Sequence, residues 1–336
     1  MLSTMSYLAM RLLACSIGLS VLVACAQSFG TPSSPVTLPQ GRGSPARFDP
    51  GNRQELYAVN NMANSITEYL ANANGNVAPG ATIAGSNTQL NAPINIARDG
   101  SGAIYVTNLN ANAVTVYPLG SNGNVAPSAT ITCGGLNLPD GAAVDASGNL
   151  YVANLQGNSI SIFSSGANGC VSNPGHIRGH HTKLSRPTAL MISGSRLYVA
   201  NINTHSIAVY PTSARGDARP TSEIEGSNTN LANPVGLAMD AGHNLYVSDD
   251  FAAAIFVFAA GANGNVSPIR TIQGTSTQLN SPSGIVLTAH GTIVVANPPS
   301  NSLTSYPQGS NGNVTPDRTI EGPATGLNFP IGLSIR

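Results

Sequence analysis

The chain of 336 residues has 14 Lys and Arg against 14 Asp and Glu, so its formal net charge is zero and only 8% of its residues are charged. An ordinary globular domain has about 25% charged residues. So neutral a composition excludes nucleic acid as a partner and a polybasic attachment to anionic lipid, because both need clustered Lys and Arg. The 36 Gly and 23 Pro are typical of many short strands joined by tight turns.

The N-terminus has the pattern of an export signal. Residues 12–24 are apolar and uncharged, and Arg11 directly precedes them. This segment is shorter than the roughly 20 residues of a membrane-spanning helix, and a short apolar stretch after a positive charge is typical of a secretory signal. The start of translation stays open among Met1, Met5 and Met10, since no charged side chain precedes Arg11.

Leu22-Val23-Ala24-Cys25 ends this segment and resembles the lipobox of bacterial lipoproteins. The resemblance implies that residues 1–24 are a lipoprotein signal peptide and that Cys25 is lipidated. Two or more acyl chains anchor a protein stably, so we expect an extracytoplasmic membrane lipoprotein that touches the membrane through its lipid only. Ala26 is not the Asp that retains some lipoproteins at the inner membrane, which favours the outer membrane or the cell surface. A soluble secreted protein is the alternative, because Ala24-Cys25-Ala26 also fits a small-x-small cleavage site.

The next segment is predicted to be a tether. Residues 25–52 contain Ser, Gly and Thr without apolar periodicity, together with Pro32, Pro35, Pro39, Pro45 and Pro50. Such a composition does not bury enough apolar surface to fold. We therefore expect a disordered tether over 25–52 and one folded domain over 53–336.

The folded domain is built from an internal repeat. Similar segments begin at Leu56, Ile104, Leu150, Leu197, Leu245 and Ile293, with spacings of 48, 46, 47, 48 and 48 residues between successive positions. Four short strands fit each unit, here called A to D; in the second unit they cover 94–99, 103–108, 112–117 and 128–132. Asn-Gly pairs such as Asn122-Gly123 lie between C and D and supply the positive φ of tight hairpin turns. Four strands in about 47 residues are typical of a β-propeller blade.

The two ends of the domain predict the number of blades. B strands are expected six times, the first at 55–60, and A strands six times, the last at 331–336. The last A strand can therefore complete the blade that 55–60 begins, which removes two open sheet edges. We predict an all-β, six-bladed β-propeller, closed by 331–336.

The repeat also resembles the NHL family. Pro282-Ser-Gly-Ile-Val and Gly148-Asn-Leu-Tyr-Val-Ala-Asn154 carry the resemblance, which extends over residues 55–336. It implies a six-bladed propeller and says little about function, because propellers host unrelated activities.

Alternating strand directions place the D–A and B–C loops on one face of the ring, the face where we expect a ligand to enter. The B strands end there in Asn60, Asn108, Asn154, Asn201, Asp249 and Asn297. A ring of oxygens suits Ca²⁺, but recurrence in every blade favours a structural role in which each side chain bonds its own turn.

Departures from the repeat are the better candidates for a site. Asp140 in a D–A loop and Asp250 beside Asp249 resemble, with the Asn ring, the metal site of six-bladed lactonase-like hydrolases, although no Glu falls on this face near the channel. His180, His181 and His205 share the face and are a second candidate, for Zn²⁺ or a general base. NHL-like amidating lyases use His around a metal. The alternative for all three is an exposed structural position on the rim.

The two remaining cysteines are predicted to be free. Cys133 ends a D strand and Cys170 lies in a C–D loop, so the two cysteines are predicted to lie on opposite faces of the ring. That separation is roughly 15 Å at 3.3 Å per residue, whereas a disulfide needs Cα atoms within about 7 Å.

Two functions remain open. The first is a monomeric, membrane-tethered binding or scaffold module for a protein, a glycan or a small ligand, and the lack of a recognisable catalytic motif favours it over an enzyme. The alternative is a metal-dependent hydrolase or lyase at the channel mouth, with Ca²⁺ or Zn²⁺ bound by the Asp or His candidates.

Overall fold

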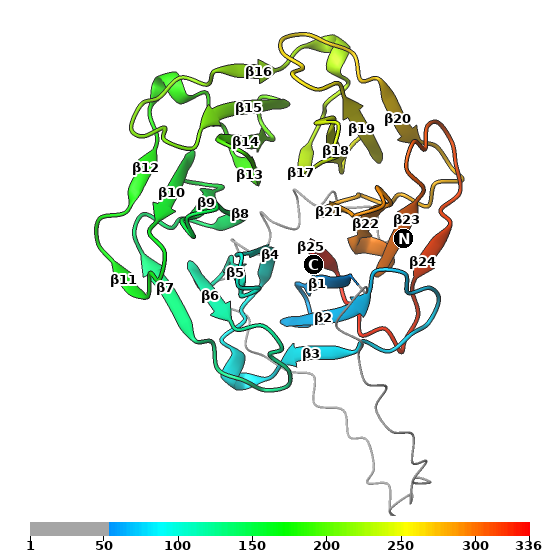
Figure 1. The fold of residues 1–336 in the computed structure, drawn as a ribbon, viewed down its shortest axis with the longest axis horizontal. Helices are drawn as coiled ribbons and strands as arrows, with labels where there is room; N and C mark the ends of the chain where they lie inside the picture. Colours follow the sequence, from blue (N-terminus) through cyan, green and yellow to red (C-terminus); the bar gives the residue numbers. More distant parts are fainter. Residues whose placement is uncertain (1–53) are drawn as a thin grey trace, which may run out of the picture. The chain divides into compact units, whose positions relative to one another are not determined.

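A computed structural model describes residues 54–336. The predicted signal peptide, Cys25 and the tether lie outside the described residues. Six sheets form a ring around a central axis (Figure 1), so the all-β, six-bladed propeller is confirmed. Within the described part, no helix is long and apolar enough to cross a membrane.

Each blade is an antiparallel sheet whose A strand lies innermost. Blade I has the order β25 (Pro330–Ile335), β1 (Glu55–Asn60), β2 (Ser65–Leu70), β3 (Ala81–Ala84). Blade II has β4 (Pro93–Arg98), β5 (Ile104–Asn108), β6 (Ala113–Tyr117), β7 (Ala129–Cys133), and blade III has β8 (Pro139–Val144), β9 (Leu150–Asn154), β10 (Ser159–Phe163), β12 (Gly175–Ile177).

The other three blades repeat this order. Blade IV has β13 (Pro187–Ser193), β14 (Arg196–Asn201), β15 (Ser206–Pro211), β16 (Ser222–Ile224), and blade V has β17 (Pro234–Met239), β18 (Leu245–Asp249), β19 (Ala254–Phe258), β20 (Arg270–Gln273). Blade VI has β21 (Ile285–Leu287), β22 (Ile293–Asn297), β23 (Ser302–Tyr306), β24 (Arg318–Ile320). Short 3₁₀ helices are η1 (Ser86–Thr88), η2 (His180–Thr182), η3 (Ser227–Thr229) and η4 (Pro298–Ser300).

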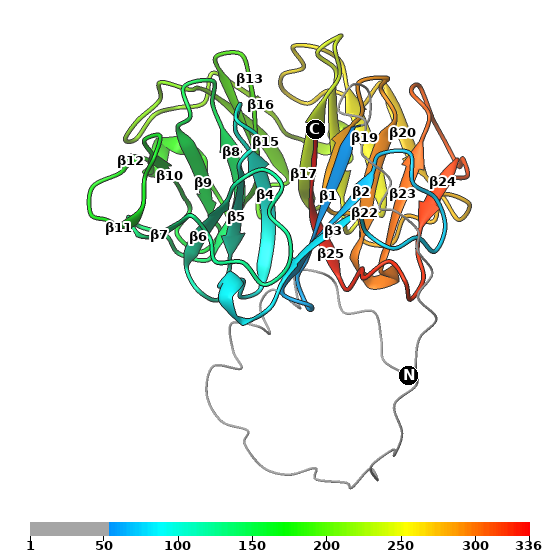
Figure 2. The same ribbon diagram turned by 60° about the horizontal axis from the view of Figure 1, so that its bottom comes forward.

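The ring closes through blade I, as the sequence predicts. β25 pairs antiparallel with β1, with Leu56 opposite Ile335 and Ala58 opposite Leu333. Figure 2 shows the red and blue strands side by side, although they come from opposite ends of the domain. Pairing of the last strand with the first removes the open edges that would otherwise recruit another chain.

Five A strands begin at a proline, one or two residues earlier than predicted. Pro93, Pro139, Pro187, Pro234 and Pro330 are their first residues. Proline is tolerated at the first position of a strand because its missing N–H removes no bond from the middle of the ladder. In blade VI the strand starts only at Ile285, because the register with β22 begins there.

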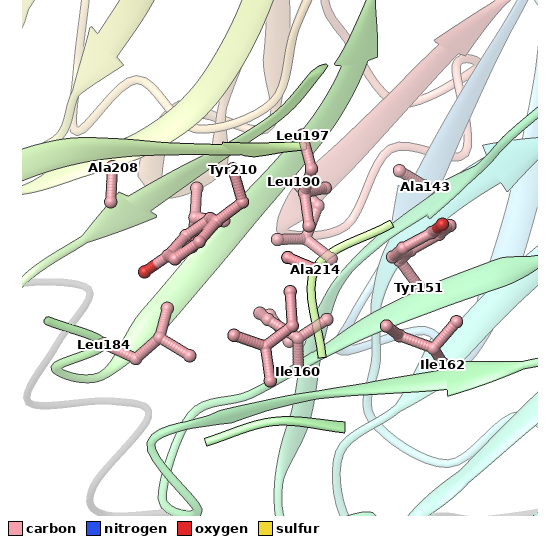
Figure 3. Packing of buried hydrophobic residues seen from close by; sticks show 13 residues of the cluster. Ala143, Tyr151, Ile160, Ile162, Leu184, Leu190, Leu197, Ala208, Tyr210 and Ala214 are labelled. Atoms are coloured by element: carbon pink, nitrogen blue, oxygen red, sulfur yellow. The ribbon is translucent and has the colours of Figure 1, made fainter. Parts of the chain in front are cut away.

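The hydrophobic core lies between neighbouring sheets rather than within one blade. Figure 3 shows the cluster between blades III and IV, in which Ile160 and Tyr151 face Leu197 and Tyr210. The hydroxyl of Tyr210 donates to the carbonyl of Thr182 in the loop that joins the two blades. Each large side chain buried in this way contributes about 1.5–3 kcal/mol, so every blade is stabilised mainly by its two neighbours.

The C–D segments differ from simple hairpin turns. The Asn-Gly glycines do have positive φ, for example +78° at Gly123. However, each glycine pairs in parallel with the outer strand of the preceding blade, as Gly123 does with Ile83, and the same pairing occurs at all six junctions. The asparagine belongs to this contact, since Asn122 Oδ1 accepts from the Thr82 amide at 2.9 Å. The Asn-Gly pairs therefore join blades.

At five of the six junctions, the residue after the C–D glycine makes a second contact, called here the junction cap. At the I–II junction, Asn124 Oδ1 accepts from the backbone N–H of Asn87 at 2.8 Å, in the short turn after the outer strand of blade I. Gly85 begins that turn because a Cβ there would lie 2.5 Å from the Asn124 Cγ. The same cap occurs at four other junctions, with Asp217, Asn265, Asn313 and Asn76 as acceptors.

The prediction of two free thiols is wrong. Cys133 and Cys170 form a disulfide with a Cα–Cα distance of 5.0 Å. The prediction assumed that a C–D loop stays on the face opposite the D–A loops. Instead, Cys170 lies in β11 (Gly169–Val171), which pairs in parallel with β7 at the outer edge of blade II. The crossing segment thereby brings the two cysteines together at the II–III junction.

Candidate functional site

The Asn and Asp side chains that end the B strands hold loops in place. Asn108 Oδ1 accepts from the Asn91 amide at 3.0 Å, and its Nδ2 donates to Thr115 Oγ1 at 3.0 Å. The amide acceptor lies in the D–A loop that enters the same blade, rather than in the residue's own turn as expected. Equivalent contacts to the D–A loop occur at Asn60, Asn154, Asn201 and Asn297. The ring of oxygens is thus occupied by backbone donors.

Asp249 ends the B strand of blade V, where the other five blades have asparagine. Phe256 of β19 stands in blade V where Thr115 stands in blade II. An amide Nδ2 would therefore lack its usual acceptor, whereas the carboxylate accepts from the backbone amides of Ala232, Asn233 and Ala252 at 2.8–3.0 Å. Burial raises the pKa of Asp249, and these hydrogen bonds oppose the rise. Blade IV also lacks this hydroxyl, since Ala208 stands there, yet it has Asn201, whose buried Nδ2 has no hydrogen-bond partner. The missing hydroxyl alone therefore does not account for Asp249, whose carboxylate serves the same loop-holding role as the asparagines.

The two other acidic candidates are buried in different blades. Asp140 is 1% exposed at the start of β8 in blade III, and its carbonyl accepts from Thr107 Oγ1 at 2.6 Å. Asp250 is 5% exposed at the start of the B–C loop of blade V, where its amide donates to the carbonyl of Asn233.

The histidine candidates take part in different junctions. His181 Nδ1 lies 2.7 Å from Asp217 Oδ2, and its backbone amide donates to Oδ1 of the same carboxylate, which is the cap of the III–IV junction. His205 Nδ1 contacts the carbonyl of Ala232 at the entry to blade V. The neighbour His180 is exposed in η2. The sequence correctly placed these side chains in D–A and B–C loops. In the structure, however, His181 and His205 contact residues of two different junctions.

Over residues 54–336, no three His, Cys, Asp or Glu side chains approach closely enough to hold a metal ion. The three Asp candidates therefore do not form such a group with one another, and neither do the three His candidates.

An asymmetry of the B–C loops was missed at the sequence level. Phe251 in blade V is 73% exposed and Met62 in blade I is 55% exposed. The equivalent loops of blades II, III and IV have Asn110, Gln156 and Asn203, and the loop of blade VI between them has exposed Pro299. Blades V, VI and I thus place an apolar arc, defined as Phe251, Pro299 and Met62, on the D–A/B–C face. Alignment of the repeats at the position after each B strand would have revealed it.

The opposite face is hollowed between blades V and VI. A cavity of about 540 Å³ lies there, among the A–B turns that contain Asp240 and His290 and the side chains of Gln54 and Gln308. The carboxylate of Asp240 is engaged within its own turn, where Oδ1 accepts from the Asn244 amide at 2.8 Å. Burial opposes ionisation of Asp240, but the hydrogen bonds from Asn244 and its neighbours outweigh it and lower the pKa.

Comparison with known proteins places the chain in the class of six-bladed β-propellers. A chain of the crystal structure of a nidogen–laminin complex superposes with a TM-score of 0.56 at 15% identity, covering 84% of this chain and 98% of that chain. A putative 6-phosphogluconolactonase from Bacteroides fragilis gives 0.56 at 14%, covering 84% and 98%. Virginiamycin B lyase from Staphylococcus aureus gives 0.53 at 14%, covering 77% and 84%.

Identities this low establish the fold and nothing finer. No protein-family model and no curated protein matches the sequence. The resemblance to NHL repeats therefore stays a prediction.

Proposed function

We propose that this protein is an extracytoplasmic β-propeller, tethered to a membrane through Cys25, that binds a partner protein with the apolar arc of its D–A/B–C face. The exposure of Phe251 carries the proposal. A phenylalanine that is 73% exposed in its B–C loop, with exposed Pro299 and Met62 in the corresponding loops of the next two blades, is costly to leave in water. Aromatic residues and Met are enriched where proteins dock.

The arc favours a protein over a small ligand because it protrudes. Small molecules bind in concave sites that bury most of their surface, whereas Phe251 and Met62 project from separate loops. The polar half of the same face, with Asn110 and Asn203, has no equivalent apolar side chain. A partner would therefore bind off-centre, over blades V, VI and I. Among proteins with the same fold, one chain comes from a nidogen–laminin complex.

The disulfide supports a location outside the cytoplasm. Cys133 and Cys170 are both exposed, and disulfides persist mainly in oxidising compartments. The lipobox and the tether predicted for residues 1–52 agree with such a location. NHL-like repeats are the family that the blade motifs favour.

The binding proposal is tested with a photo-reactive benzoylphenylalanine at position 251 or, as a matched control, at position 110. In cells that produce the protein, position 251 should give a discrete adduct with one protein, and position 110 should not. With the partner purified, Phe251→Asn should weaken binding at least tenfold, and Asn110→Ala should change it less than twofold. Equal adducts from both positions, or unchanged affinity of Phe251→Asn, would contradict the proposal.

The anchor is tested separately. Mass spectrometry of the N-terminal peptide should show acylated Cys25, and Cys25→Ser should move the protein from the membrane to the soluble fraction. An unmodified N-terminus at Gln27 would instead establish the soluble secreted form.

The metal-dependent hydrolase or lyase stays an untested alternative. Elemental mass spectrometry of the dialysed protein, together with assays for lactone turnover, decides it. One tightly held Ca²⁺ or Zn²⁺ per chain, lost on Asp250→Asn or on His181→Ala, would favour the enzyme over the binding module.

A further inference from the structure

The II–III junction differs from the other five in two linked features. At the other five junctions a short turn follows the outer strand of the preceding blade. The junction cap, an Asn or Asp directly after the C–D glycine, accepts a hydrogen bond from a backbone amide of that turn. At the II–III junction Cys170 takes the place of that capping residue, and Cys133 takes the place of the glycine that faces it. The D–A loop here is two residues shorter than the loop from Gly85 to Leu90, since Leu136 follows Cys133 by three positions and Leu90 follows Gly85 by five.

The shorter loop removes the amide that would be capped. At the I–II junction the cap binds the amide of Asn87, in η1, and no 3₁₀ helix is present in the stretch after β7. The first contact of the junction is retained, because Asn168 Oδ1 still accepts from the Thr130 amide at 3.0 Å. The Cys133–Cys170 bond therefore stands where the cap would be, and it is covalent.

We propose that this bond is a thiol–disulfide exchange site, and that its reduction by a dithiol protein opens the II–III junction while the other five junctions stay closed. Both cysteines are exposed, so a thiolate can reach either sulfur. After reduction, no cap replaces the lost bond at this junction, whereas the remaining five caps contain no sulfur and are insensitive to the same reagent.

The partner dithiol supplies the two electrons that reduce the disulfide. A thiolate of the dithiol attacks one sulfur of the pair, the S–S bond breaks, and a mixed disulfide forms as the other cysteine leaves as a thiolate. The second thiolate of the partner then displaces the first cysteine. The protein gains two electrons and, after protonation, two thiols, and the dithiol is oxidised to a disulfide. In the reverse direction an oxidised partner closes the junction during maturation.

The opening would act on a defined part of blade III. The segment that contains Cys170 forms one wall of a cavity of about 310 Å³, whose other wall includes Ile162 and Phe163 of β10. With the disulfide reduced, residues 168–174 keep the Asn168 contact, the pairing of β11 with β7 and the packing of Val171, while β12, from Gly175 onward, stays paired with β10. Reduction should thus loosen this wall before it affects the ring.

Hydrogen exchange of the full-length protein, with dithiothreitol as the probe dithiol, tests the proposal. After reduction, peptides covering 129–138 and 168–174 should exchange at least tenfold faster. Peptides covering 270–277 and 309–316, at the V–VI junction, should be unchanged. Alkylation should label Cys133 and Cys170 only in the reduced sample.

Two variants are matched controls. Cys133→Ser with Cys170→Ser should exchange like the reduced protein without any reagent. Cys133→Gly with Cys170→Asn, the pair found at the neighbouring junction, should show no response to dithiothreitol. Unchanged exchange at the II–III junction after complete alkylation, or equal acceleration at all six junctions, would overturn the proposal.

Discussion

The II–III and IV–V junctions solve the same packing problem with different chemistry. Both pair the glycine of a C–D segment with an isoleucine of the preceding outer strand, Gly169 with Ile131 and Gly264 with Ile224. Asn265 then caps the turn of η3 through a hydrogen bond of 2.7 Å, whereas Cys170 bonds covalently to Cys133. The ring geometry therefore determines where two segments meet, while the residue pair at the meeting point determines how strongly they are held.

Among the changes at these junctions, removal of the disulfide should cause the largest loss of unfolding free energy. The double substitution Cys133→Ser with Cys170→Ser removes a cross-link between positions that are 37 residues apart in the sequence. The entropy regained by the unfolded chain should lower the free energy of unfolding by about 2–4 kcal/mol. Denaturant titration measures the loss, and the reduced wild type is the control. A loss of unfolding free energy smaller than that caused by removing a single junction cap would show that the II–III junction does not depend on the disulfide.

A methyl group at the glycine of the IV–V junction should have the next largest effect. Gly226 has φ of +118°, and its Cβ would lie 2.5 Å from the Asn265 Cγ. Backbone strain of this kind costs about 1–3 kcal/mol, and the overlap adds to it. Gly261→Ala is the control, because Gly261 has φ of +74° and nothing lies within 4 Å of its Cβ. Equal losses of unfolding free energy in the two variants would mean that the close approach is unimportant.

Loss of the cap itself should be smaller. Asn265→Ala removes one side-chain acceptor from the exposed amide of Asn228. Capping residues contribute about 0.5–2 kcal/mol, so this variant should lose less than the double cysteine variant. Combination with Gly226→Ala should be less than additive, since the overlap disappears with the asparagine side chain. Strict additivity in a double-mutant cycle would contradict direct contact between these two positions.

The smallest effect should be a pH dependence at the III–IV junction. The hydrogen bond from the His181 side chain, followed by that from the His181 amide, lowers the pKa of the exposed Asp217. A lowered folded-state pKa means that this contribution is complete above the ordinary Asp value and is lost as pH falls through the lowered one. Exchange of the His181 amide should therefore accelerate in acid beyond its intrinsic rate. The Asn228 amide, capped by neutral Asn265, should show no such step.

Most of the fold was predictable because its signals are local. Alternating apolar residues, Gly and Asn turns and a repeat of about 47 residues predict blades, and the unmatched strands at 55–60 and 331–336 predict their closure. The B strands were placed within one residue of the structure, for example Ile104–Asn108 against 103–108. The structural role of the Asn ring was also predictable from its recurrence, although its partners in the D–A loops were not.

The ring geometry alone decided which distant residues meet. Asn-Gly pairs indicate a turn, but nothing in the local pattern shows that Gly123 pairs with Ile83 of another blade. For the same reason the Cys133–Cys170 bond was excluded at the sequence level, and the candidate histidines were grouped on one face although His181 and His205 contact different junctions. Strand pattern and turns depend on neighbours in the chain and can be read from it. Contacts across a junction depend on where the C–D segment of one blade lies against the outer strand of the preceding blade, and only the tertiary structure determines that position.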